Sequence, residues 1–331
     1  MTFRWLAERL DRACIEFAIR PTLPAFTAES PFPRLRLAEE RTQVFLTDEA
    51  LFHEPPAPRP MGSRSRESGA LRELTISWDG PSFDLEQSWF PGASRALQVK
   101  SNWYLRALPR PLVMLIRGWT PFPNLSSSIL WPIKQLDRAG YDVVIPYWPA
   151  QTGNLFKRSP NRIPSRDPSR NIVELVRATT AIGQLLMVAR DLGHGSIVVW
   201  GASLGAHLVA LLATRRVPIH AGLYVLEKPL CRLSDPMRLH GRGVAVQRHA
   251  IADRLDQVYR CVSPLDRSLQ VDAKNIIVIA GEYDQITPLS GAELLANRWG
   301  APLHQVAASH LFDVHRTRRI LEILQRELRP P

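Results

Sequence analysis

The sequence contains little cysteine and no long apolar run. Its 331 residues include only three cysteines, at positions 14, 231 and 261. Cysteines this few and this scattered argue against a disulfide framework or a cysteine-ligated zinc site, and they favour a reducing compartment. The N-terminal residues do not predict a signal peptide, and no uninterrupted apolar run approaches the ~20 residues that cross a bilayer. We therefore expect a cytoplasmic protein.

Lysine is also scarce, although the chain is strongly basic. The formal net charge is +11, yet only five of the 42 basic residues are lysines, and the arginines are spread along the whole chain. No nucleic-acid-binding motif accompanies them, so we expect an arginine-rich solvated surface and no nucleic-acid partner. Attraction to an anionic substrate or to an anionic membrane surface is the alternative.

Residues 1–94 are predicted to form an N-terminal extension. Residues 3–17 fit an amphipathic helix whose apolar face carries Phe3, Leu6, Leu10, Cys14 and Phe17. We expect this face to dock on the body of the protein; anchoring to lipid or to a partner is the alternative. Residues 53–69 are rich in proline, serine and arginine and predict a flexible loop, whereas residues 74–78 and 96–105 predict strands at an antiparallel edge.

In residues 95–331, apolar strand patterns alternate with helical patterns. The predicted strands are 112–116, 141–146, 197–200, 221–226, 275–280 and 302–307, and the predicted helices are 125–139, 171–192, 204–214, 289–298 and 311–327. This alternation predicts an α/β catalytic domain whose mostly parallel sheet is covered by helices on both faces. The polar, weakly helical residues 228–274 interrupt the pattern and predict a lid-like insertion over the carboxyl ends of the strands.

The most informative motif follows the apolar run 197–200. It reads Gly201-Ala202-Ser203-Leu204-Gly205, and a helix-forming segment comes directly after it. A strand that turns sharply into a helix through Gly-x-Ser-x-Gly exposes the serine hydroxyl at the edge of the sheet. The sequence therefore predicts Ser203 as a nucleophile and the amide of Leu204 as a free hydrogen-bond donor at the start of the helix.

Two further motifs follow Ser203 along the chain. Asp284 lies in the stretch 281–288, which fits Gly-x-x-Asp-x-x-x-Pro, and His310 follows Ser309 after the last predicted strand. With these residues in the order Ser, Asp, His, the chain from about residue 95 to the end resembles the α/β-hydrolase-fold serine hydrolases, an esterase- and lipase-like superfamily. The resemblance implies a catalytic triad in which Asp284 orients His310 and His310 activates Ser203.

Other side chains compete for these roles. Glu227 ends a predicted strand at a place where some relatives of this fold have their acid; otherwise it forms a surface ion pair with Lys228. His304 is expected to pack along a strand, and His315 to be exposed on the last helix. His207, in the first turn after the nucleophile, is expected to pack or cap there, or to border the site.

The resemblance also implies an oxyanion hole with two backbone donors. One is the amide of Leu204, and the other is the amide of Trp119, which follows Arg117 and Gly118 at the end of a predicted strand. The family usually has a histidine where this chain has Arg117, and this departure affects the hydrogen bonding of the loop; a plain glycine turn is the alternative. Aromatic residues surround these loops, and the candidate substrate-pocket residues are Gly118, Phe122, Trp148 and Phe156.

These residues predict a serine hydrolase that cleaves a carboxylic ester through an acyl-enzyme intermediate, with no metal and no organic cofactor. The expected partner is a small-molecule ester or acyl substrate. A thioesterase, a lipase or an acyltransferase uses the same machinery, with or without a membrane surface. A hydrolase-like binding protein without activity is the alternative from another class. The sequence leaves the oligomeric state open.

Overall fold

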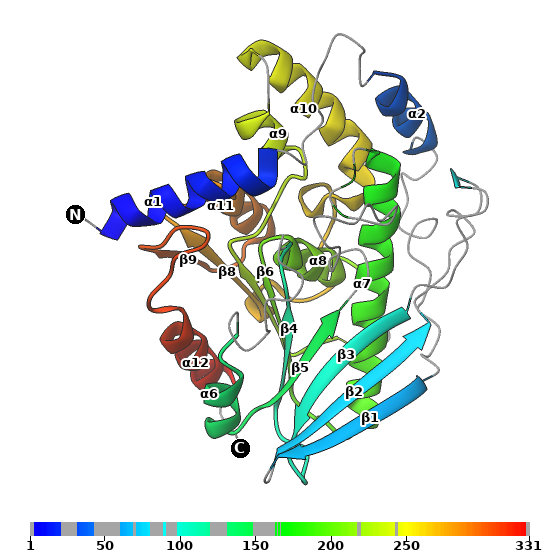
Figure 1. Cartoon of the computed structure of the whole chain (residues 1–331), viewed down its shortest axis with the longest axis vertical. Coiled ribbons are helices and arrows are strands. Elements are labelled where there is room, and N and C mark those ends of the chain that lie inside the picture. The colour runs from blue at the N-terminus through cyan, green and yellow to red at the C-terminus, as the bar shows by residue number, and fades with distance from the viewer. Residues whose placement is uncertain are drawn as a thin grey trace.

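One twisted sheet runs through the molecule (Figure 1). The computed structural model describes residues 3–20, 32–42, 60–68, 71–79, 89–90, 98–119, 131–147, 163, 165, 167–216, 220–241 and 244–328. Within these residues nine strands form the sheet, in the order β1-β2-β3-β5-β4-β6-β7-β8-β9. They are β1 (Pro60–Ser68), β2 (Leu71–Asp79), β3 (Gln98–Leu105), β4 (Leu112–Ile116), β5 (Asp142–Tyr147), β6 (Ile197–Ala202), β7 (Leu223–Glu227), β8 (Ile276–Gly281) and β9 (Leu303–Val306).

The direction of the strands changes at β5. The pairs β1–β2, β2–β3 and β3–β5 are antiparallel, whereas every pair from β5–β4 to β8–β9 is parallel. The expected mostly parallel sheet with an antiparallel edge is thus confirmed. Because the chain passes from β4 to β5 and then back across β4 to β6, the order of the strands reverses beside β4. In α/β sheets, sites form at the carboxyl ends of the strands where the order reverses in this way.

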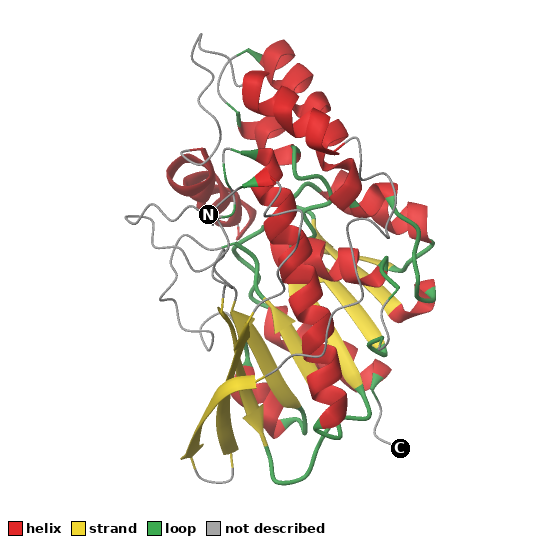
Figure 2. Ribbon diagram, turned by 90° about the vertical axis from the view of Figure 1, so that its right-hand side faces the viewer, coloured by secondary structure: helices red, strands yellow, loops and turns green. Residues whose placement is uncertain are grey.

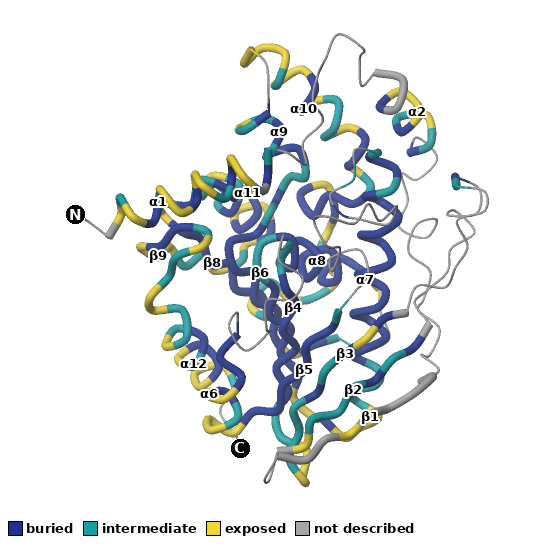
Figure 3. The backbone as a smooth tube through the Cα atoms, in the orientation of Figure 1, coloured by how far each residue is buried: buried dark blue, intermediate teal, exposed yellow. Residues whose placement is uncertain are grey.

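Helices cover both faces of the sheet (Figures 1 and 2). One face packs against α7 (Pro168–Asp191), α8 (Leu204–Ala213) and α11 (Leu289–Trp299), and the other against α6 (Ile133–Arg138) and α12 (Arg316–Glu327). Successive residues of β4 alternate between these two cores: Met114 faces the first, and Val113 and Leu115 face the second. A continuous apolar run is what a strand buried on both faces requires, and the central strands are accordingly buried along their length (Figure 3).

The long helix α7 begins earlier than the sequence predicted. Asp167 caps it by accepting a hydrogen bond from Ser169 N at 3.0 Å, and Pro168 takes the first helical position. Asn171, the predicted start, instead bonds Tyr259 through its side chain. Among the described residues, α7 is the one helix whose length and composition would suit a membrane span, but 89% of that apolar window is buried inside the protein, as in a core helix.

The prediction of a flexible loop over 53–69 was wrong for residues 60–68, which form the edge strand β1; residues 53–59 and 69 lie outside the described residues. β1 pairs with β2 through its backbone, and the register sets Arg66 opposite Glu73 and Glu67 opposite Arg72. An edge strand needs backbone partners more than an apolar face. The strand pattern of β1 was therefore not recognised in a segment rich in serine and arginine.

The N-terminal helix docks with a different face from the predicted one. It comprises α1 (Phe3–Cys14), continued by the π-helical turn η1 (Ile15–Ile19). Four residues at four-residue spacing are buried, namely Ala7, Asp11, Ile15 and Ile19. The predicted docking residues Leu6, Leu10 and Phe17 are exposed instead, Phe17 to 85%. The apolar pattern predicted the wrong docking face because the face that is buried has an aspartate, Asp11, at its centre.

The interval 228–274 contains mostly helical structure. It forms α9 (Asp235–His240), α10 (Ala245–Tyr259) and the short 3₁₀ turns η3 (Arg260–Val262), η4 (Pro264–Asp266) and η5 (Ala273–Asn275). α10 contacts α7 and α2 (Phe32–Thr42), and α9 contacts η1. These helices and α1 therefore gather at one end of the molecule, beyond α8 (Figure 1).

Candidate active site

Ser203 occupies the tight turn between β6 and α8. Its backbone has φ 57° and ψ −121°, a conformation that costs a side-chain-bearing residue roughly 1–3 kcal/mol and persists only where its surroundings enforce it. Backbone hydrogen bonds hold the turn: Ser203 N donates to Glu227 O at 2.9 Å, and Ser203 O accepts from His207 N at 3.1 Å and from Leu230 N at 3.4 Å. The turn therefore holds the hydroxyl at the carboxyl edge of the sheet.

The two glycines of the elbow allow α8 to lie directly against β6 and β4. A Cβ on Gly201 would collide with the backbone of Gly205, and a Cβ on Gly205 would collide with the carbonyl oxygen of Ile116. Both obstacles are backbone atoms, which cannot swing aside. The Gly-x-Ser-x-Gly pattern is therefore a packing requirement here, and a larger residue at either glycine would displace Ser203.

The structure brings Ser203, His310 and Asp284 together in one hydrogen-bonded chain. His310 Nε2 lies 3.0 Å from Ser203 Oγ, and His310 Nδ1 lies 2.8 Å from Asp284 Oδ2. Asp284 comes from the turn after β8, and His310 from the loop after β9. The imidazole is thus oriented on one side by a carboxylate and directed on the other at the hydroxyl, the arrangement that a nucleophile and its base require.

The carboxylate of Asp284 is fully buried and fully bonded. Its Oδ1 accepts hydrogen bonds from Ile286 N at 2.8 Å and Thr287 N at 2.7 Å, and its Oδ2 accepts one from Thr287 Oγ1 at 2.7 Å. Burial alone would raise the pKa of Asp284. The attraction and hydrogen bond of His310 and the donors of Thr287 outweigh burial, so that the pKa lies below its ordinary value. Asp284 is therefore held as an anion facing His310.

Two polar residues that the sequence analysis did not single out contact these groups. Thr287 Oγ1 lies 3.0 Å from His310 Nδ1 as well as bonding Asp284. The carboxylate of Asp11, on α1, accepts a hydrogen bond from His310 N at 2.9 Å. Thr287 had a local signal, because a threonine three residues after an aspartate can bond its side chain. The signal of Asp11 was weaker, an acid at a spacing of four from the small or apolar residues Ala7 and Ile15.

The loop after β4 runs against Ser203. A Cβ on Gly118 would lie 2.9 Å from Ser203 Cβ and 2.8 Å from Ala202 O, so only glycine allows this approach. Trp119 follows it, and its side chain packs with Ile15, Ile19 and Ile286. Leu204 is buried and opens α8, where an amide has no acceptor within the helix. Of the two predicted oxyanion donors, Leu204 directly follows Ser203 in the chain, and Trp119 directly follows the glycine that lies against Ser203. Three of the predicted pocket residues, Phe122, Trp148 and Phe156, lie outside the described residues.

Arg117, where the family usually has a histidine, turns its side chain into the protein. It is 2% exposed, and its guanidinium lies over the ring of Tyr147, 4.6 Å from the ring centre. Burial lowers the pKa of Arg117. The departure at this position is thus accommodated by stacking on an aromatic residue of β5, while the backbone of the next residue, Gly118, keeps its place beside Ser203.

The competing acid, Glu227, is engaged elsewhere. Its carboxylate accepts hydrogen bonds from Arg316 Nε at 2.7 Å and Nη2 at 2.8 Å, and from Trp200 Nε1 at 3.0 Å. Burial would raise the pKa of Glu227, but Arg316 and the other donors lower it to about 2. The alternative ion pair with Lys228 is not the one formed, because Lys228 pairs with Asp313 at 3.7 Å.

The competing histidines lie away from Ser203 Oγ. Both ring nitrogens of His207 face backbone carbonyl oxygens, of Leu230 at 2.8 Å and of Val262 at 3.0 Å, and burial lowers its pKa to about 4. His304 is partly buried on β9, and His315 is exposed at the start of α12. Among all of these, only His310 bonds both the hydroxyl and a carboxylate in the described structure.

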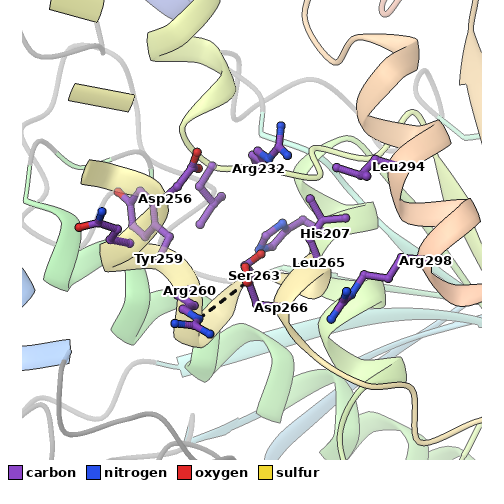
Figure 4. A pocket seen from close by; sticks show the side chains of 12 residues that line it. His207, Arg232, Asp256, Tyr259, Arg260, Ser263, Leu265, Asp266, Leu294 and Arg298 are labelled. Atoms are coloured by element: carbon purple, nitrogen blue, oxygen red, sulfur yellow. Dashed lines mark ion pairs between the residues drawn. The ribbon is translucent and has the colours of Figure 1, made fainter. Parts of the chain in front are cut away.

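A cavity of about 480 Å³ lies beside α8, between α10, η4 and α11 (Figure 4). Its lining includes the buried His207 together with Arg232, Arg260 and Arg298, but none of the three residues of the hydrogen-bonded chain. Arg260 is paired there with Asp266 at 3.8 Å. Among the described residues, no group of three or more His, Cys, Asp and Glu side chains is arranged to hold a metal ion.

Comparisons with known proteins find similarity in structure but not in sequence. No protein-family model matches the sequence, and no curated protein matches it. Acetyl xylan esterase 1 from Thermoanaerobacterium sp. JW/SL YS485 matches with a TM-score of 0.58 at 12% identity, over 96% of this chain and 98% of that one. An acetyl xylan esterase from Paenibacillus sp. R4 matches with the same TM-score and identity, over 93% and 98%. Carboxyl esterase 2 from Tuber melanosporum matches with a TM-score of 0.51 at 17% identity, over 88% and 96%.

At such low identities these likenesses establish the fold alone. This chain's own strand order reverses beside β4, and its turn at Ser203 lies between a central parallel strand and the following helix. The chain has the α/β-hydrolase fold, as its resemblance in sequence implied.

Proposed function

We propose that the protein is a serine hydrolase that cleaves carboxylic esters, with Ser203, His310 and Asp284 as its catalytic triad. The observation that supports this most is the hydrogen-bonded chain from Ser203 Oγ through His310 to Asp284, with distances of 3.0 and 2.8 Å. A serine hydroxyl is a weak nucleophile until a base takes its proton. Each of the three residues stands at the carboxyl edge of the sheet, where this fold carries out its chemistry.

The reaction proceeds in two halves. In the first, His310 Nε2 takes the proton of Ser203 Oγ as this oxygen attacks the ester carbonyl carbon, and then gives the proton to the departing alcohol. In the second half, His310 takes a proton from water, which attacks the acyl-enzyme, and returns it to Ser203 as the acid leaves. Asp284 fixes the tautomer of His310 and stabilises its cationic form in both halves.

The negative charge on the carbonyl oxygen is stabilised by the amides of Leu204 and Trp119. The position of Leu204 at the start of α8 supports the first donor, since such amides have no acceptor within the helix. The contact between Gly118 and Ser203 supports the second, because it brings the loop that carries Trp119 to the nucleophile. Loss of one such donor in a related site costs about 10²–10³ in kcat.

The activities for which the structural neighbours are named support esters as the substrate class. Two are described as acetyl xylan esterases and one as a carboxyl esterase. We therefore place a carboxylic ester first and a thioester, a lipid ester or acyl transfer to an acceptor other than water second, because the same triad serves all of these.

Labelling with a fluorophosphonate probe tests the proposal directly. The probe forms a covalent bond with an activated serine, so we expect labelling of the wild type and none of Ser203→Ala. Ser290→Ala, which changes an exposed serine at the start of α11, is the matched control and should be labelled like the wild type. A folded wild-type protein that is not labelled would contradict the proposal and favour a hydrolase-like binding protein.

A panel of activated substrates then separates the substrate classes. Esters of increasing acyl length, the matching thioesters, and an ester with an added alcohol acceptor distinguish an esterase, a thioesterase and an acyltransferase by their relative kcat/KM and products. Faster turnover of short-chain esters than of thioesters would support a carboxylesterase. Preference for the thioester series would overturn the ester assignment but not the triad.

A further inference from the structure

The carboxylate of Asp11 accepts four hydrogen bonds beside the triad, although it lies on the N-terminal helix. Asp11 is fully buried. Its Oδ2 accepts hydrogen bonds from His310 N at 2.9 Å and Gln285 N at 3.2 Å. Its Oδ1 accepts from Ser309 Oγ at 2.9 Å and Leu311 N at 3.0 Å. One side chain therefore serves four donors that belong to two loops more than 270 positions away in sequence.

The two loops are those that carry the base and the acid of the triad. His310 and Leu311 donate to Asp11 through their backbone N–H groups, and Ser309 donates through its hydroxyl. Gln285 directly follows Asp284, so its bond to Asp11 fixes the turn from which the Asp284 carboxylate projects. Hydrogen bonds from an amide to a carboxylate are short and about twice as strong as those between neutral groups. Asp11 thus ties the base to the acid.

The rest of the N-terminal segment reinforces this connection. Ile15 and Ile19 pack with Ile286 of the acid turn. Gln285 is held at its other end too, since its carbonyl oxygen lies 2.8 Å from His240 Nε2. The N-terminal segment also contacts His240, because Arg20 Nε donates to His240 O at 3.2 Å. The acid turn is therefore enclosed by residues 11–20 and α9, and Asp11 supplies the polar part of this contact.

We propose that Asp11 is a positioning residue of the active site, which holds the loops of His310 and Asp284 at the separation that activates Ser203. This inference rests on the proposed function. Asp11 acts through these loops and does not touch the reacting atoms. Displacing a catalytic group by about 1 Å costs on the order of 100-fold in rate. Loss of Asp11 should therefore slow the chemical step while leaving substrate binding unchanged.

Asp11→Asn is the most informative substitution, since it keeps the size of the side chain. An amide has one accepting oxygen instead of two, so at least one backbone N–H in the two loops must lose its acceptor. In the full-length protein we expect the maximal rate of inactivation by a fluorophosphonate to fall about 10- to 100-fold. The concentration for half-maximal rate should stay near the wild-type value. Ester hydrolysis should show the same split, with a lower kcat and a nearly constant KM.

Two matched variants separate positioning from a general loss of stability. Glu8→Gln removes a carboxylate from the same helix that is paired, among the residues the structure describes, with the exposed Arg4, and it should react like the wild type. Ser309→Ala removes one of the four bonds and keeps the charge of Asp11, so its rate should fall less than that of Asp11→Asn. Combining Asp11→Asn with Ser309→Ala should cost less than the product of the two separate losses, because both act on one contact.

The outcomes are distinct. A wild-type protein that reacts, together with folded Asp11→Asn and Ser309→Ala variants that react equally fast, would overturn the inference and leave the proposed function standing. So would a smaller reactive fraction whose remaining molecules react at the wild-type rate, since this is what a purely structural role gives. A wild type that does not react would overturn the proposed function, and the inference with it.

Discussion

Glu227 and Asp284 are two buried carboxylates at the carboxyl ends of neighbouring parallel strands, since Glu227 ends β7 and Asp284 follows β8, and they have different partners. Glu227 faces the guanidinium of Arg316, whereas Asp284 faces the imidazole of His310. In both cases burial would raise the pKa and the partner brings it below its ordinary value. The environment thus keeps both groups charged.

The difference lies in what the partner can do with a proton. A guanidinium does not give up its proton in a protein, so the pair of Glu227 and Arg316 can only join β7 to α12. An imidazole gains and loses a proton near neutral pH, and His310 also reaches Ser203 Oγ. A carboxylate at the end of a parallel strand is therefore placed where it could take part in catalysis. Whether it does so depends on whether its partner can accept and release a proton.

The largest expected effect comes from removing the imidazole that distinguishes the two sites. His310→Ala takes the base from Ser203 and the partner from Asp284, so kcat for an activated ester should fall on the order of 10⁶-fold, about as far as in Ser203→Ala. The double variant should be no slower, because the residues act as a unit. His315→Ala changes an exposed histidine five positions on and should behave like the wild type. Substantial turnover by His310→Ala would show that His310 is not the base. The contrast between Asp284 and Glu227 in catalysis would then be lost.

Neutralising each carboxylate compares them directly. Asp284→Asn should lower kcat by roughly 10⁴-fold, because the amide no longer holds the required tautomer of His310. Glu227→Gln should leave kcat/KM close to the wild-type value. It should lower the free energy of unfolding by about 3 kcal/mol, because the guanidinium of Arg316 loses the buried carboxylate that balances its charge. Steady-state kinetics and urea unfolding on both variants provide the check. A reversed pattern would move the catalytic acid to Glu227.

The pH dependence of stability should report Glu227. Its pKa is about 2 in the folded protein against an ordinary value of 4.5. A carboxylate with a lowered pKa stabilises the fold above its ordinary pKa, and this contribution is lost as the pH falls towards the folded value. The stability advantage of the wild type over Glu227→Gln should therefore be full at pH 6 and shrink from pH 4.5 downwards. A difference that stays constant in urea titrations down to pH 3 would refute the assignment.

Much of the fold and the three central site residues follow from local signals. The apolar runs of β4, β6 and β8 have the continuous pattern of strands buried on both faces, and residues 203, 284 and 310 each follow such a run or the last strand. Parallel strands bring their carboxyl ends to one edge, so three motifs far apart in sequence can be placed together without knowing the loops between them.

The misses share a cause, since each element is held in place by hydrogen bonds of polar groups, which a hydrophobic pattern does not take into account. β1 is stabilised by backbone pairing with β2, and a polar composition does not reveal that. The docking face of α1 is organised around Asp11, whose donors lie in loops after β8 and β9. An analysis of hydrophobic periodicity assigns an aspartate to the exposed face, so it predicted that the wrong face of the helix is buried.

The smallest expected effect concerns the neutral donors that each carboxylate has. Thr287 Oγ1 donates to Asp284, and Trp200 Nε1 donates to Glu227. A hydrogen bond to a charged group contributes about 1.5–3 kcal/mol, so Thr287→Val, which keeps the shape of the side chain, should lower kcat roughly tenfold through a less well oriented Asp284. Trp200→Phe should cost stability but not kcat, because Glu227 orients no base. Kinetics and thermal unfolding of both variants would measure this contrast, and an equal loss of kcat in the two would mean that the carboxylates share one network.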